Sequence, residues 1–100
     1  MKASFDQIIQ DPRPVVVDFF ATWCGPCKAQ APILQSFASE MGDAVRVIKI
    51  DVDQNPEVAQ RYGIQSIPTM MIFQAGNVRY RQPGVHQKEQ LKQLVRPYLA

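Results

Sequence analysis

The only two cysteines of the chain, Cys24 and Cys27, are separated by two residues in the stretch WCGPCK. This spacing suits half of a metal site, a structural disulfide or a redox-active pair. A structural zinc site needs four ligands, usually two cysteine pairs or one pair with two histidines. The chain offers these two thiols and one histidine, His86, which disfavours zinc. A purely structural disulfide is also disfavoured, because stabilisation by loop closure grows with loop length and this loop is very short.

The position of the two cysteines favours redox chemistry. Cys24 falls where a predicted strand ends and a predicted helix begins, so unpaired amide groups and the positive end of the helix dipole favour its thiolate. A thiolate is the attacking species in thiol–disulfide exchange. Cys27 lies one turn further on, close enough to attack the resulting mixed disulfide, and Pro26 is compatible with a first helical turn. The pattern predicts Cys24 as the nucleophile and Cys27 as the resolving cysteine.

The elements that must position this pair alternate along the chain. Residues 15–21, VVVDFFA, form a nearly continuous β-branched and aromatic run, which is typical of a strand covered on both faces. Helical spacing of apolar residues then continues to Met41, where Gly42 supplies a stop. The other predicted elements are a capped helix from Ser4 that ends before Pro12, a strand at 45–52, a helix between Asn55 and Gly63, a hairpin of 69–74 with 78–82, and a helix from about Gln87.

This order predicts the fold class. The first strand–helix–strand unit requires a right-handed crossover between parallel strands, whereas the closing hairpin is antiparallel. We therefore predict an α/β sandwich whose mixed sheet has helices on both faces. The length of 100 residues and the 46% hydrophobic content fit one ordinary core, so residues 1–100 are predicted to be a single domain.

The net charge and hydropathy of the chain disfavour some classes of binding partner. The formal net charge is +2 and the basic residues are scattered, which disfavours nucleic acid. No stretch approaches the ~18 consecutive apolar residues of a membrane helix, and the first residues lack the apolar core of an export signal. We expect a cytoplasmic protein that binds neither nucleic acid nor a membrane.

Asp18 is the anomaly in the first predicted strand. Its neighbours Val16, Val17, Phe19 and Phe20 make burial the favoured interpretation over an outward-facing edge position. A buried carboxylate without a partner has a raised pKa. An acidic residue in an apolar strand is thus a candidate for a functional role.

The segment VVVDFFATWCGPCK resembles the active-site segment of the thioredoxin family, and the similarity continues through KIDVDQNP, YGIQSIPTMMIF and GVHQKEQL. It is more specific than a lone cysteine pair, because Asp18 precedes Cys24 by six residues, Pro32 follows Cys27 by five, and IPT comes later. The resemblance implies the thioredoxin fold and a thiol–disulfide oxidoreductase that reduces protein disulfides. It implies a redox-active Cys24–Cys27 disulfide, no bound cofactor or metal, and a monomer recycled by a flavin- and NADPH-dependent thioredoxin reductase.

The same resemblance assigns roles to two charged residues. Asp18 should lie beneath Cys27 and act, through water, as the base that deprotonates its thiol. Lys49 is similar to the family lysine that neighbours the buried aspartate and tunes its ionisation; the alternative is a solvated strand residue.

A substrate-docking surface is also implied by the resemblance. Pro68 resembles the family's cis-proline, which would leave the backbone of Ile67 free to pair with an extended substrate. The flat apolar patch around the nucleophile would consist of Trp23, Gly25 and Pro26 with Ile67, Gly84 and Val85. His86 is interpreted as a surface or helix-start residue.

The chain departs from the family pattern at its amino terminus. Ser4 and Phe5 already match the first helix, so the family's leading edge strand is missing or reduced. We therefore predict a four-stranded sheet with a newly exposed edge, which needs protection by charge, proline or a partner.

Two other functions stay open at this point. An exported disulfide oxidant or isomerase commonly has a histidine between the cysteines, whereas Gly25 and Pro26 favour a reductant. A thioredoxin-like binding or chaperone module is the other alternative. The presence of both cysteines, Asp18 and Pro68 weighs against it, because binding alone needs no acid–base groups.

Overall fold

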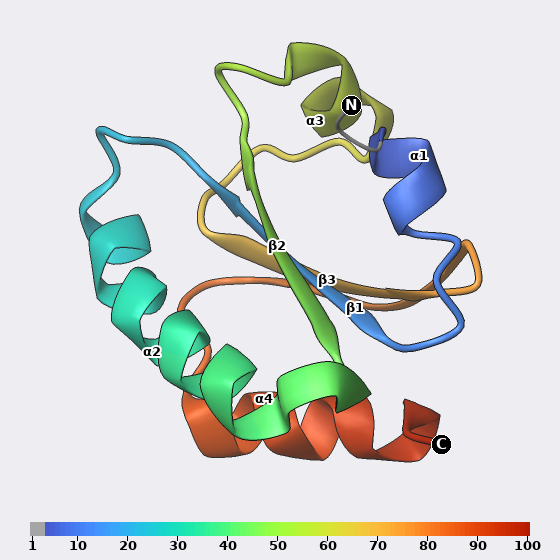
Figure 1. Cartoon of the computed structure of the whole chain (residues 1–100). Helices are drawn as coiled ribbons and strands as arrows, with labels where there is room; N and C mark the ends of the chain where they lie inside the picture. Colours follow the sequence, from blue (N-terminus) through green and yellow to red (C-terminus); the bar gives the residue numbers. More distant parts are fainter. Residues whose placement is uncertain (1–3) are drawn as a thin grey trace.

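The computed structural model describes residues 4–100, in which four strands form one mixed sheet in the order β2-β1-β3-β4 (Figure 1). Strand β1 is parallel to β2 and antiparallel to β3, and β3 is antiparallel to β4. The predicted α/β sandwich with a mixed sheet is confirmed. The strands are β1 (Val15–Phe20), β2 (Arg46–Asp51), β3 (Thr69–Gln74) and β4 (Asn77–Pro83).

Helices cover both faces of this sheet. Helices α2 and α4 lie on one face, and α1 and α3 lie on the other (Figure 1). The helices are α1 (Phe5–Ile8), α2 (Gly25–Met41), α3 (Pro56–Arg61) and α4 (Lys88–Val95), with 3-10 turns η1 (Gly42–Ala44) and η2 (Arg96–Tyr98).

Strand β1 divides the core into two apolar clusters, because successive side chains of a strand point to opposite faces. Val16 packs with residues of α2 and α4 such as Leu34 and Leu91. Val17 and Phe19 pack in the second cluster, which Phe5 and Tyr62 border. By this alternation Asp18 lies on the face of Val16, which is the face that α2 covers.

The local signals at two of the helices are confirmed. Ser4 and Gln7 form a capping box at the start of α1, and Gly42 ends α2 with a φ of 54°, a conformation that favours glycine. Asn55 is the N-cap residue of α3, but its side chain makes no capping bond. Its Nδ2 instead donates to the Asp51 carbonyl at 3.0 Å.

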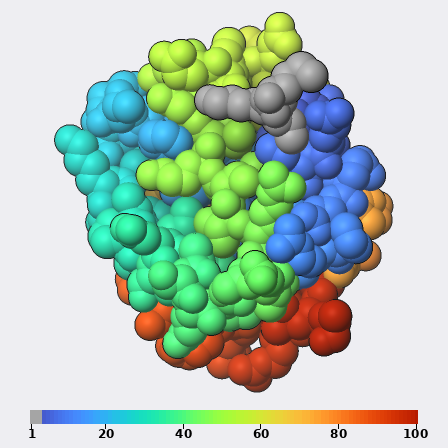
Figure 2. All heavy atoms as spheres, viewed as in Figure 1, coloured from blue at the N-terminus to red at the C-terminus, as the bar shows by residue number. Residues whose placement is uncertain are grey.

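Strand β2 is the edge that the predicted four-stranded sheet leaves exposed. Among residues 4–100 it pairs with β1 only, and Figure 2 shows its atoms at the surface between α2 and the first helix. Three charged residues, Arg46, Lys49 and Asp51, lie on this strand. Charge on an edge strand opposes pairing with another chain, so the protection expected for this edge is present.

Candidate active site

The two cysteines lie at the start of α2 and form a disulfide. Cys24 is the N-cap residue and Cys27 the third helical residue, and their Cα atoms are 5.3 Å apart. The backbone N–H of Cys27 donates to Cys24 Sγ at 3.2 Å. Free N–H groups and the helix dipole favour negative charge at this position, so the geometry favours Cys24 as the thiolate of the reduced pair.

The segment Ile67–Pro68 lies against the disulfide. Its peptide bond is cis, as the resemblance implies. The Ile67 carbonyl oxygen is 3.7 Å from Cys24 Sγ, and the Ile67 side chain packs on a small buried cluster of Ala21, Cys24 and Cys27. The structure thus brings together the cysteines, Ile67 and Pro68.

Trp23 is the most exposed large apolar residue next to the disulfide, with 69% of its surface accessible. Its indole Nε1 donates to Asp53 Oδ2 at 2.8 Å, so the ring is held while it stays open to solvent. Gly25 and Pro26 are also exposed at the helix start. Asp53 was not predicted from the sequence, because nothing in the pattern connects this loop residue with Trp23.

Gly84 and Val85 form a loop after β4. Gly84 has a φ of 102°, which glycine tolerates without strain, and its N–H donates to the Pro68 carbonyl at 2.8 Å. Val85 is 37% exposed. The hydrogen bond connects this loop to the cis-proline segment, so these two parts of the predicted docking patch are held together.

Asp18 is fully buried within β1. Neither of its carboxylate oxygens has a hydrogen-bond partner among residues 4–100. Burial therefore raises the pKa of Asp18 to about 6, and the positive charge of Lys49 opposes part of this rise. The burial predicted for this residue is confirmed, and its pKa lies where the carboxyl can exchange a proton near neutral pH.

Lys49 lies opposite Asp18 in the parallel pairing of β1 with β2. It is exposed, and its Nζ is 4.5 Å from the centroid of the Phe20 ring. A cation over an aromatic face is held by the ring's negative face. Lys49 therefore acts on Asp18 through its charge across the strand pair, without an ion pair between them among those of residues 4–100.

His86 directly precedes Gln87, the N-cap of α4, as the helix-start interpretation expects, but its interpretation as a surface residue is wrong. Only 2% of its surface is exposed, because its ring packs against Tyr80 and its backbone bonds to Gln30. Gln30 was also missed, although a signal existed. It occupies a buried position of α2 in the series Cys27, Gln30, Leu34 and Phe37, where a polar residue needs a buried partner.

Residues 4–100 contain neither a metal-binding cluster nor a membrane-spanning helix. No group of three or more His, Cys, Asp or Glu side chains is arranged to hold a metal ion. No helix in this part of the chain combines the length and apolar character needed to cross a membrane.

Known proteins resemble this chain over nearly its whole length. The thioredoxin family model matches residues 1–97. A thioredoxin of Alicyclobacillus acidocaldarius is 48% identical over 90 residues, which are 90% of this chain and 86% of that protein. A bifunctional thioredoxin reductase/thioredoxin of Mycobacterium leprae is 47% identical over 87% of this chain, but over 19% of its own length. The X-ray structure of Fasciola hepatica thioredoxin superposes with a TM-score of 0.80 at 36% identity, covering 89% of this chain and 84% of that one.

The matches and the site agree on the chemistry. The family is one of protein-disulfide reductases, and the cysteine pair is closed into a disulfide at the start of α2. This combination supports thiol–disulfide exchange by this chain. The chain belongs to the thioredoxin family of thiol–disulfide oxidoreductases.

Proposed function

We propose that the reduced protein transfers two electrons to a protein disulfide in two exchange steps. The Cys24 thiolate attacks one substrate sulfur, which forms a mixed disulfide and releases the other substrate sulfur as a thiolate. The Cys27 thiolate then attacks Cys24 Sγ, which forms the Cys24–Cys27 disulfide and releases the second substrate thiolate. The substrate disulfide is reduced and the cysteine pair is oxidised, so the electrons balance.

Asp18 accepts the proton that Cys27 must lose before the second step. The carboxylate is on the α2 face of β1, buried and without hydrogen-bond partners among residues 4–100. A base with a pKa of about 6 is ionised at neutral pH and still basic enough to take a proton. The proton passes through water, and the Lys49 charge keeps the carboxylate ionised at neutral pH.

The docking surface for the substrate surrounds Cys24. It comprises Trp23, Gly25, Pro26, Ile67, Pro68, Gly84 and Val85. An extended substrate segment would pair with the Ile67 backbone beside the nucleophile, while exposed apolar groups contact its side chains. A surface of this kind suits disulfides carried by proteins.

The electron donor is a flavin- and NADPH-dependent thioredoxin reductase, which reduces the Cys24–Cys27 disulfide after each cycle. A relative of this chain is named a bifunctional thioredoxin reductase/thioredoxin, which supports the pairing with a thioredoxin reductase. No cofactor needs to bind this chain, because the cysteine pair itself stores the electrons. We place the protein in the cytoplasm, where reductants maintain thiols. We also propose that it is a monomer, because the charges on the edge strand β2 oppose pairing with another chain.

One observation carries this proposal: Cys24 is the N-cap of a 17-residue helix, and the Cys27 N–H donates to its sulfur. The direct test is reduction of insulin by the protein with NADPH and a thioredoxin reductase. We expect NADPH consumption that requires both this chain and the reductase. A protein that dithiothreitol reduces but that transfers no electrons to insulin would contradict the proposal.

The direction of electron flow has its own test. We expect the reduction potential of the Cys24–Cys27 couple, titrated against a dithiothreitol or glutathione buffer, to lie near the reducing end of the range of thioredoxin-fold proteins. A potential near the oxidising end would indicate an oxidant or isomerase instead. Pro26→His is the matched variant, because a histidine beside the thiolate stabilises the reduced form and should raise the potential.

A further inference from the structure

His86 connects three elements that lie far apart in the sequence. It follows the loop Gly84–Val85, its ring meets Tyr80 of β4, and its backbone meets Gln30 of α2. His86 and Gln30 are both buried, with 2% and 0% of their surfaces exposed. The proposed chemistry uses neither residue, so this buried polar group needs another explanation.

The side-chain amide of Gln30 forms a two-bond clamp with the backbone of His86. Its Oε1 accepts from the His86 N–H at 2.7 Å, and its Nε2 donates to the His86 carbonyl at 3.0 Å. An amide group thus pairs with a peptide group through a donor and an acceptor at once. Gln30 lies three residues after Cys27 on α2, so the clamp connects the cysteine helix directly to the loop.

The His86 ring fixes the other side of the same loop. Its Nδ1 is 2.8 Å from the Gly84 carbonyl, which can only accept, so Nδ1 carries the hydrogen. Its Nε2 then accepts from the Tyr80 hydroxyl at 2.8 Å. With one ring nitrogen donating and the other accepting, the ring satisfies both contacts.

Val85 carries the apolar side chain of this loop that these bonds leave exposed. Gly84 is held to Pro68 through its N–H and to His86 through its carbonyl, while His86 is held to α2. Val85 lies between these two anchored residues and is 37% exposed. Its position relative to the cis-proline segment and to the start of α2 is therefore set by the clamp.

We propose that Gln30 and His86 are positioning residues for protein substrates, because they pre-form the Gly84–Val85 side of the docking surface. The ligand class is an extended disulfide-bearing protein segment with an apolar side chain that rests on Val85. Pre-forming this side lowers the ordering cost of binding. A small disulfide reaches Cys24 without contacting Val85, so it does not depend on the clamp. This inference rests on the proposed docking of protein disulfides around Cys24.

The test compares Gln30→Met with Gln35→Met, which makes the same change at an exposed position of α2. Insulin reduction is assayed with dithiothreitol as reductant, after subtraction of the rate without protein. The small disulfide dithiobis(nitrobenzoate) is mixed instead with pre-reduced protein freed of dithiothreitol, because dithiothreitol would reduce this disulfide directly. For Gln30→Met we expect kcat/KM for insulin to fall about tenfold through KM, with the small-disulfide rate within about twofold of wild type. Gln35→Met should match wild type on both substrates, and the reduction potential should not change in either variant.

Equal losses on both substrates would overturn the proposal, because the clamp would then only support the cysteine helix. Unchanged insulin kinetics would also overturn it. If the wild type reduces neither disulfide, the proposed function itself fails, which is a different result. If Gln30→Met does not fold, Tyr80→Phe takes its place, since it removes one hydroxyl and leaves the bonds to Gly84 and Gln30. It should lower kcat/KM for insulin about twofold and leave the small-disulfide rate unchanged; no selective loss would overturn the proposal.

Discussion

Asp11 precedes β1 and Asp18 lies within it. The surroundings of these two carboxyl groups shift their pKa values in opposite directions. Arg13 donates to Asp11 from Nε at 3.1 Å, from Nη2 at 2.7 Å and from its backbone N–H at 2.9 Å. Arg46 adds a second cation at 3.7 Å. The side-chain bonds from Arg13 lower the pKa of Asp11 to about 2, whereas burial without a partner raises the pKa of Asp18 to about 6. The surroundings, not the residue type, favour the ionised form of the Asp11 carboxyl and the protonated form of the Asp18 carboxyl.

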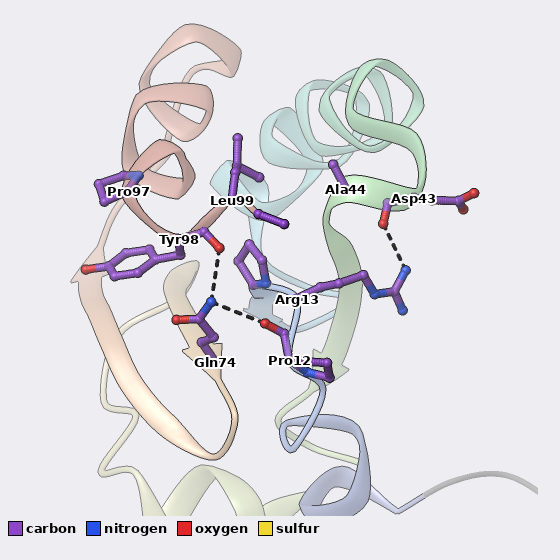
Figure 3. A pocket seen from close by; sticks show the side chains of 10 residues that line it. Pro12, Arg13, Asp43, Ala44, Gln74, Pro97, Tyr98 and Leu99 are labelled. Atoms are coloured by element: carbon purple, nitrogen blue, oxygen red, sulfur yellow. Dashed lines mark hydrogen bonds between the residues drawn. The ribbon is translucent and has the colours of Figure 1, made fainter.

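The larger surface pocket of the protein lies near Asp11 and not near Asp18. A cavity of about 630 Å³ lies at the Asp11 end, with Arg13, Asp43, Gln74 and Leu99 among its walls (Figure 3). Hydrogen bonds from Arg13 to the Asp43 carbonyl and from Gln74 to the carbonyls of Pro12 and Tyr98 connect the chain segments there. None of its lining residues belongs to the predicted active site. The larger of the two described pockets thus lies away from the cysteines, whereas a smaller pocket of about 310 Å³ has Lys49 among its walls.

The largest effect should come from removing the nucleophile at the Asp18 end. Cys24→Ser should lower insulin reduction by about a thousandfold or more, because serine is not ionised at neutral pH. Cys27→Ser should leave the first step intact and accumulate a mixed disulfide between Cys24 and insulin, which non-reducing electrophoresis with mass spectrometry detects. A Cys24→Ser protein that still turns over insulin would remove the basis of the assignment.

Asp18→Asn should give the second-largest effect, because asparagine mimics the protonated acid and cannot ionise. The folded-state pKa of Asp18 is raised from 3.8 to about 6, so ionisation costs the folded protein about 3 kcal/mol above pH 7. The wild type should lose this stability as the pH rises from about 4 to about 6. The variant should lack this loss and be more stable than wild type at pH 8 by about 3 kcal/mol.

Urea unfolding of the oxidised proteins at several pH values measures this difference. In the same variant, insulin reduction at pH 7 should slow about tenfold to a hundredfold, since the base for Cys27 is gone. Equal stability of variant and wild type at pH 8 would mean that Asp18 is ionised without cost. Asp18 and Asp11 would then not differ in the way that their pKa shifts predict.

Asp11→Asn should change the free energy of unfolding in the opposite direction to Asp18→Asn, and by a smaller amount. The lowered pKa of Asp11 contributes stability that is present above about pH 4 and is lost as the pH falls toward about 2. Because Arg13 is 42% exposed, solvent screening reduces this contribution to about 1 kcal/mol. The variant should be less stable than wild type at pH 7 by this amount, equally stable near pH 2, and fully active with insulin. A loss of activity would show that the region around Asp11 influences the chemistry at the cysteine pair.

Lys49→Gln should give the smallest effect. Its positive charge lowers the pKa of Asp18, so its removal should raise that pKa further, by less than about one unit. The pH midpoint of insulin reduction should move upward accordingly, while Cys24 chemistry at pH 9 stays as in wild type. A downward movement of the midpoint would contradict the sign of the interaction.

Much of the fold could be predicted from local sequence patterns. The apolar run after Pro14 predicts β1, and the same neighbours predict that Asp18 is buried, because every residue around it avoids water. The cysteine pair and Gly42 delimit α2 correctly. The predicted four-stranded sheet is confirmed for residues 4–100, whereas the leading edge strand would precede Ser4 and so lies outside the described residues.

The contacts between distant residues could not be predicted. His86 follows a loop and shows no apolar period, so its burial depends on Tyr80 and Gln30, which arrive from other elements. Trp23 and Asp53 meet 30 residues apart, and no short motif records that meeting. Asn55 has the right residue type for an N-cap, but its side chain finds a competing acceptor at Asp51.

The most direct test of this account is a carboxyl ¹³C NMR titration of the oxidised wild-type protein, in which Asp11 and Asp18 are followed in one sample. We expect Asp18 to titrate near pH 6 and Asp11 near pH 2. That result would establish a buried proton acceptor on the α2 face of β1 and an ion-paired carboxyl at the opposite end. Midpoints that both fall near the ordinary aspartate value, about 4, would contradict the account.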